Sequence, residues 1–140
     1  MQNEFDPIPT AEGWQLSNPP ILSLSAIRAS LDLFESAGFE NLLQKSRQLT
    51  GFFIECIDGL LADQVQIVTP TQEQFRGCQL SLEIALKDRS GKDVYERLEA
   101  TGVRTDWREP NVIRAAPTPF YNTYSEVVDF CIRLGDILAS

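Results

Sequence analysis

The feature that most constrains the fold is a strict alternation of side chains over residues 79–86. Every second position is apolar: Leu80, Leu82, Ile84 and Leu86 alternate with Gln79, Ser81, Glu83 and Ala85. A period of two places the apolar side chains on one face of an extended strand. Such a strand needs partners at its edges and an apolar layer on one face only, so the pattern predicts a sheet with helices on one side.

The rest of the chain supplies those partners. Helical spacing predicts a helix over 23–37 that ends at Gly38, and a second over 40–61 in which Gly51 marks a close contact. Residues 71–78 are predicted to form a polar loop, and residues 87–92 are predicted to form a turn. Thr123–Glu126 has the form of a capping box and opens a last helix. The further predicted elements are strands over 65–69, 103–106 and 112–116 and a helix over 93–101 that ends at Gly102.

This order predicts an α+β fold. Two N-terminal helices precede a ββαββα layer with a mostly antiparallel four-stranded sheet. Residues 1–20 are polar and rich in proline, which indicates an extended lead-in. Residues 21–140 then form one small domain, which is large enough to enclose its own core.

Composition excludes several functions. A net charge of −8 leaves no basic stripe for nucleic acid or for an anionic membrane. The chain has no histidine, and its three cysteines lack metal-ligand spacing, so no metal site is predicted. The thiols sit in apolar contexts, which favours buried small hydrophobic residues over reactive groups. The N-terminus lacks a signal-peptide pattern, and together with the free thiols this predicts a cytoplasmic protein.

Arg114 is the most conspicuous candidate for chemistry. It interrupts the apolar run Val112–Ala116, which prolines bracket on both sides. A guanidinium is always charged and is costly to bury without a partner. Two interpretations stand side by side: a structural ion pair with Asp106 or Glu109, or an anchor for a ligand carboxylate held by two hydrogen bonds.

Three segments resemble kynureninases, which are pyridoxal-phosphate hydrolases of the aminotransferase-like fold. They occur in the family's order and together span about residues 13–138. The segments are Gly13-Trp-Gln-Leu-Ser-Asn-Pro-Pro-Ile21, Arg76-Gly-Cys-Gln-Leu-Ser-Leu82 and Asp106-Trp-Arg-Glu-Pro-Asn-Val-Ile-Arg-Ala-Ala-Pro-Thr-Pro-Phe-Tyr-Asn122. The resemblance implies the small C-terminal domain, with the large cofactor-binding domain and its catalytic lysine absent from this chain.

The resemblance also implies roles for individual residues. Arg114 matches the arginine that holds the substrate α-carboxylate, and Asn18 matches the asparagine that faces the aromatic amino-ketone end. Trp14 is a candidate pocket wall. For Asn18 the alternative is turn formation before proline, and for Trp14 it is packing. No catalytic residue is expected within the segment, and its cofactor-binding residues are unknown.

The implied reaction is hydrolysis of kynurenine or its 3-hydroxy form to the corresponding anthranilate and alanine. It belongs to tryptophan catabolism and the route to NAD. The whole protein would be a homodimer that uses pyridoxal phosphate, and the segment alone would be inactive. Two rivals remain: a relative such as a cysteine desulfurase, against which the Asn-Pro-Pro segment argues, and a non-catalytic module that binds a small ligand.

Overall fold

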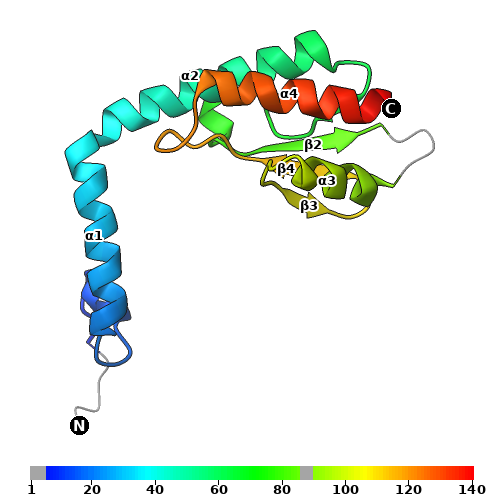
Figure 1. The fold of residues 1–140 in the computed structure, drawn as a ribbon. Helices are drawn as coiled ribbons and strands as arrows, with labels where there is room; N and C mark the ends of the chain where they lie inside the picture. Colours follow the sequence, from blue (N-terminus) through cyan, green and yellow to red (C-terminus); the bar gives the residue numbers. More distant parts are fainter. Residues whose placement is uncertain (1–5, 86–89) are drawn as a thin grey trace. The chain divides into compact units, whose positions relative to one another are not determined.

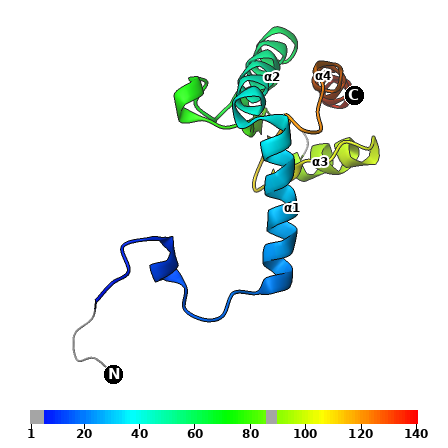
Figure 2. The ribbon, with the colours of Figure 1, turned by 90° about the vertical axis from the view of Figure 1, so that its left-hand side faces the viewer.

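The computed structural model describes residues 6–85 and 90–140. The chain divides into two compact units, Met1–Phe39 and Glu40–Ser140. Each unit is described by itself below (Figures 1 and 2). The predicted domain boundary after residue 20 differs from the division between these units, which falls after Phe39. The units are defined by contacts between residues, so the domain boundary stays a prediction.

The first unit consists of a short 3-10 helix, η1 (Ala11–Trp14), and the helix α1 (Ile21–Ala37). α1 starts directly after Pro19 and Pro20, two residues before the predicted start. It ends as predicted at Gly38, whose positive φ of 79° lets its N–H donate to the carbonyl of Phe34. None of the α1 side chains is buried within the structure.

The second unit begins with the long helix α2 (Phe39–Leu60), which closely follows the predicted range. Its buried side chains include Leu49, Phe53 and Ile57, which are spaced four apart and therefore share one face. The expectation that Gly51 marks a close contact is wrong. A Cβ placed on Gly51 would meet nothing within 4 Å, so this glycine is not required by packing.

Four strands form one sheet in the order β1-β2-β4-β3, and every neighbouring pair is antiparallel (Figure 1). The strands are β1 (Val65–Ile67), β2 (Leu80–Ile84), β3 (Asp106–Arg108) and β4 (Val112–Ala115). This confirms the predicted α+β fold class. The alternation that predicted β2 is also confirmed over Leu80–Ile84, while residue 86 lies outside the described residues.

The predicted strand over 103–106 is displaced. In the structure β3 covers Asp106–Arg108, because the pairing with β4 sets its register and places Asp106 opposite Arg114. Val103 instead lies in the connection after Gly102, which has a positive φ of 90°. The apolar side chain of Val103 suggested a strand, but the short connection between β3 and β4 decides which residues pair.

Helices α3 (Gly91–Ala100) and α4 (Tyr124–Ala139) complete the unit. The capping box is present as predicted: the Thr123 hydroxyl accepts from the Glu126 N–H, and the Glu126 carboxylate accepts from the Thr123 N–H. α4 lies beside α2 (Figures 1 and 2), and the rings of Phe53 and Phe130 meet edge to face at 5.2 Å.

The core lies on one face of the sheet. The buried strand residues pack against the buried faces of α2, α3 and α4. They form one cluster: Leu49, Phe53, Ile57, Leu61, Val65, Leu80, Leu82, Ile84, Val94, Leu98, Ile113, Ala115, Val127, Phe130, Cys131, Leu134 and Ile137. Ser81, Glu83 and Arg114 alternate with these residues and point to the opposite, polar face.

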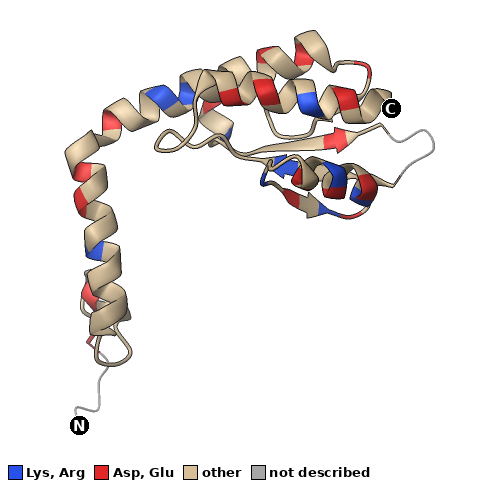
Figure 3. Cartoon of the chain, viewed as in Figure 1, with Lys and Arg blue, Asp and Glu red and all other residues tan. Residues whose placement is uncertain are grey.

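Charged residues of both signs are interspersed along the helices and strands that the structure describes (Figure 3). No continuous basic stripe runs along these described segments. Among the helices described, none combines the length and the apolar character that crossing a bilayer requires.

Two glycines give a matched test of the packing. A Cβ on Gly91, the first residue of α3, would lie 2.7 Å from the Asn111 Cα and 2.9 Å from the Pro110 carbonyl oxygen. Gly91→Ala should therefore lower the free energy of unfolding by about 1–3 kcal/mol, because backbone atoms must move. Gly51→Ala should raise it by about 0.5–1 kcal/mol through helix propensity. Urea unfolding measures both, and equal effects of the two variants would contradict the assigned packing.

The apolar side chains of α1 give a second test. Leu22, Ile27, Leu31 and Leu33 are each more than half exposed. Exposed apolar patches promote association, so the chain should self-associate at high micromolar concentration. Replacing Ile27 and Leu31 together by glutamate should shift sedimentation toward monomer, whereas glutamates at Ser23 and Ser30 add the same charge and should not. A chain that sediments only as monomer would show this expectation to be wrong.

Candidate functional site

Arg114 lies on the polar face of the sheet, in the central strand β4. Its neighbours Ile113 and Ala115 point into the core, so strand alternation directs the arginine away from the helices. The side chain is 30% exposed. Across the ladder it stands between Ser81 on β2 and Asp106 on β3. The guanidinium is therefore fixed by sheet register and still reaches solvent.

The carboxylate that Arg114 contacts is Asp106. The Arg114 Nε donates to Asp106 Oδ2 at 2.7 Å, and Nη2 donates to the same oxygen. Arg108 Nη2 lies 3.1 Å from this oxygen as well. Of the two carboxylates suggested by sequence, Asp106 is the partner; no ion pair joins Arg114 to Glu109 within the described part of the chain. The ion pair that the first interpretation predicted is thus present.

The ion pair leaves part of the guanidinium unused. Asp106 engages the edge formed by Nε and Nη2, while Nη1 makes no hydrogen bond to any residue that the structure describes. An arginine offers five N–H donors in a planar fork, and one carboxylate oxygen does not saturate them. The outer edge of the Arg114 guanidinium, which contains Nη1, can therefore still donate hydrogen bonds to an anion. A structural ion pair and an anchor for a ligand carboxylate are thus compatible roles for Arg114.

The surrounding charges act on Asp106 in turn. The hydrogen bond from Arg114 lowers the pKa of the Asp106 carboxyl below its ordinary 3.8; burial opposes this, and the charge of Arg108 reinforces it. Asp106 is consequently ionised at neutral pH. Because the folded-state pKa is depressed, the stabilisation is present above the unfolded value and is lost as the pH falls through the folded value.

Asn18 and Trp14 lie in the first unit. Asn18 is exposed in a bend before Pro19, and its amide makes no hydrogen bond among the described residues. The turn-forming alternative would have used that amide locally, so it remains available to a ligand. Trp14 is 87% exposed at the end of η1 and is not a packing residue within its unit. Arg114 belongs to the other unit.

The described residues do not fit a resident site for pyridoxal phosphate. That cofactor is attached to its enzymes through a lysine amine. Of the described lysines, Lys45 donates to the Pro119 carbonyl at 2.7 Å, and Lys92 is an exposed partner of Glu96. Neither lines a cavity found in the described structure. No chemical step can therefore be assigned to the cofactor from these residues.

Two cysteines that lie far apart in the sequence meet in the fold. The Cys56 thiol on α2 and the Cys131 thiol on α4 lie close enough to affect each other's pKa. Burial is the main cause that raises the pKa of Cys131, to about 12, and it also raises that of Cys56. Both thiols stay protonated at neutral pH, which agrees with the prediction that they act as small hydrophobic residues rather than nucleophiles.

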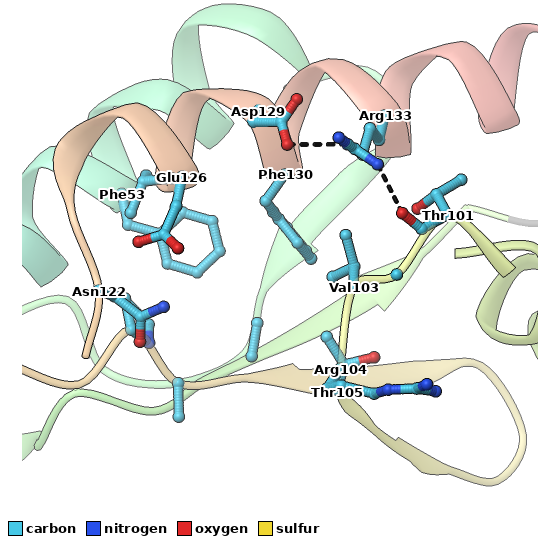
Figure 4. A pocket seen from close by; sticks show the side chains of 15 residues that line it. Phe53, Thr101, Val103, Arg104, Thr105, Asn122, Glu126, Asp129, Phe130 and Arg133 are labelled. Carbon is cyan, nitrogen blue, oxygen red and sulfur yellow. Dashed lines mark hydrogen bonds and ion pairs between the residues drawn. The ribbon is translucent and has the colours of Figure 1, made fainter. Parts of the chain in front are cut away.

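A pocket of about 360 Å³ lies between the first half of α4 and the connection from α3 to β3 (Figure 4). Its cations are already engaged. Arg133 donates to Asp129 at 2.8 Å and to the Thr101 carbonyl at 2.6 Å, and Arg104 pairs with Glu99 at 3.3 Å. No sequence pattern indicated this pocket, because its lining comes from segments far apart in the chain. Its charges satisfy one another and select no ligand.

Comparison with known proteins identifies the chain's family. The model described as the kynureninase C-terminal domain matches residues 42–134. Over 130 residues the chain is 50% identical to a kynureninase of Xanthomonas oryzae pv. oryzae and 51% identical to one of Stenotrophomonas maltophilia. These alignments cover 93% of this chain and 31% of each relative, so the chain spans about a third of their length. The chain therefore belongs to the kynureninase family and corresponds to its C-terminal domain.

Proposed function

We propose that this chain supplies the substrate-recognition part of a kynureninase. In the reaction, kynurenine or 3-hydroxykynurenine is hydrolysed to anthranilate or 3-hydroxyanthranilate and alanine. The observation that carries the proposal is Arg114, a guanidinium fixed in the central strand with one edge left open. Its planar fork suits the α-carboxylate of an amino acid.

The role of this contact is orientation. An enzyme gains rate by holding the reacting bond in one geometry, and a carboxylate clamped at one end fixes the rest of the substrate. Kynureninases are pyridoxal-phosphate enzymes, and the bond to be cleaved must be aligned with that cofactor. Cofactor attachment falls to the part of the relatives that this chain does not match, so the segment by itself should be inactive.

Asn18 is proposed to meet the opposite end of the substrate. Its exposed amide can donate to a carbonyl or a ring substituent while remaining neutral. Trp14, exposed nearby, would provide an apolar wall. A homodimer and a cytoplasmic location also belong to this proposal, as properties that the family resemblance implies for the whole protein.

The rival functions have less support. The family match and half identity to kynureninases disfavour a cysteine desulfurase. A non-catalytic module remains the alternative from another class, and it rests on the missing cofactor site. It predicts that the chain binds amino acids without assisting any reaction, even when joined to a cofactor-binding portion.

A chimaera separates these possibilities. The 130 matched residues of the Xanthomonas oryzae kynureninase would be replaced by those of this chain, and kynurenine turnover would be followed by absorbance. We expect turnover from the chimaera and none from the 140-residue chain, which should also show no aldimine absorbance band when mixed with pyridoxal phosphate. A folded, cofactor-loaded chimaera that binds kynurenine without turnover would favour the non-catalytic module.

Within the chimaera, Arg114→Ala should lower kcat/KM for kynurenine and leave cofactor binding intact. A lost charge-assisted hydrogen bond is worth about 1.5–3 kcal/mol, which corresponds to roughly 10- to 100-fold. Arg114→Lys should recover little of this, because an ammonium lacks the planar fork. If Arg114→Ala instead unfolds the protein with no specific effect on turnover, Arg114 serves only as half of an ion pair.

Asn18 gives an independent prediction at the aromatic end. Asn18→Ala should raise KM for kynurenine by about tenfold, the value of one or two hydrogen bonds, while Asn18→Asp should also impair binding because it replaces donors with a charge. Ser17→Ala removes an exposed polar side chain from the same bend and should have little effect. Equal kinetics for the Asn18 and Ser17 variants would remove Asn18 from the site.

A further inference from the structure

We propose that Asp106 is the positioning residue of the substrate-carboxylate site. Its carboxylate holds the inner edge of the Arg114 guanidinium so that the outer edge faces the incoming carboxylate. The inference rests on the proposed function of Arg114, but it adds a second residue, which neither composition nor family resemblance had given a role toward the substrate.

The first argument is the register of the sheet. Asp106 and Arg114 are paired directly across the β3–β4 ladder. Side chains at directly opposed positions are 4.5–5.5 Å apart at their Cβ atoms, which is close enough for a lasting contact. The pairing of β3 with β4 therefore keeps the Asp106 side chain next to the arginine.

The second argument is the way in which the contact is made. A single oxygen, Oδ2, accepts from both Nε and Nη2 of Arg114. Asp106 therefore occupies the guanidinium edge formed by Nε and Nη2, and Nη1 is left without this partner. The edge formed by Nη1 and the second N–H of Nη2 is thereby left to a carboxylate ligand.

The third argument is charge. Arg108 also converges on Asp106 Oδ2, at 3.1 Å, so two cations share one anion and the trio keeps a net positive charge. Glu83, a further carboxylate on this face, accepts from the Asn111 amide at 3.2 Å, and none of the ion pairs in the described structure joins it to either arginine. This net positive charge still attracts the carboxylate of a substrate, although Arg114 already contacts Asp106.

The opposite role for Asp106 would be competition. If Asp106 occupied the substrate's place on Arg114, its removal would strengthen substrate binding. The open Nη1 argues against this. The two roles predict changes in KM of opposite sign, so kinetics can decide between them.

The test uses the chimaera with Asp106→Asn and Asp106→Ala. For each variant we would measure KM for kynurenine and the inhibition constant of kynurenine amide, which lacks the carboxylate. Positioning predicts that KM rises by about tenfold or more, since a misplaced contact is costly, with the alanine variant worse than asparagine. The inhibition constant of the amide should stay within about twofold, because the amide does not use the Arg114 fork.

Glu99→Gln is the matched control. It removes a carboxylate from an arginine, Arg104, in an ion pair of 3.3 Å between α3 and the connection that follows it. Its kinetics should equal those of the unmodified chimaera. Parallel losses for kynurenine and for the amide would reduce Asp106 to a structural role, and a lower KM would identify it as a competitor; either result overturns the inference.

Arg114→Ala separates the proposed role of Asp106 from the proposed function of Arg114. If Arg114→Ala loses discrimination between kynurenine and its amide while the Asp106 variants keep it, the proposed function stands and the role of Asp106 falls. If Arg114→Ala also keeps discrimination, the proposed function itself fails.

If the chimaera variants do not fold, the contact between Asp106 and Arg114 can be tested in the 140-residue chain by nuclear magnetic resonance. The Arg114 Nε–H should give a resolved nuclear magnetic resonance signal that exchanges slowly with water, and Asp106→Asn should accelerate its exchange. A rapidly exchanging Nε–H in the unmodified chain would contradict the clamp and overturn the inference.

Discussion

The separation of the sheet into an apolar and a polar face is the constraint on which this structure depends. Leu80, Leu82 and Ile84 on β2 and Ile113 on β4 are all fully buried, and they tie the central strands to the three helices of the second unit. Because successive side chains of a strand point to opposite faces, this commits the residues between them to the other face. Arg114 is one of these residues. Its exposure is thus a consequence of how its neighbours are buried, and a slip of one residue would drive the guanidinium into the core.

On the polar face, the Arg114 guanidinium must be held in one position and still keep N–H donors free for a ligand. An isolated guanidinium would be mobile, whereas one paired by both edges would have no donors left for a ligand. The contact between Asp106 and Arg114 lies between these extremes, since one oxygen takes one edge. Sheet pairing provides the rigidity that side chains alone lack, because Asp106 is aligned with Arg114 by the backbone of β3 and β4. The same register that builds the fold therefore prepares the proposed recognition of a carboxylate.

Sequence patterns predicted the elements whose signals are local. The alternation over residues 80–84, the capping box at Thr123 and the end of α1 at Gly38 all follow from spacing and side-chain chemistry within one element. The start of β3 could not be predicted in this way, since its register depends on the strand that it joins. Gly51 was misread because a glycine in a helix does not by itself reveal whether a neighbour lies close. At the site, the sequence identified Arg114 and two possible partners, but choosing Asp106 over Glu109 required the strand pairing. The contact between Cys56 and Cys131 was likewise invisible, because it joins two distant helices.

The central claim is that Arg114 receives the carboxylate of the substrate while Asp106 retains its hold. A crystal structure of the active chimaera with a bound, unreactive kynurenine analogue tests it most directly. The account predicts a carboxylate oxygen within about 3 Å of Arg114 Nη1 or Nη2, with the hydrogen bond from Nε to Asp106 still in place. An analogue whose carboxylate is bound by a different cation, with Arg114 facing only Asp106, would contradict the account.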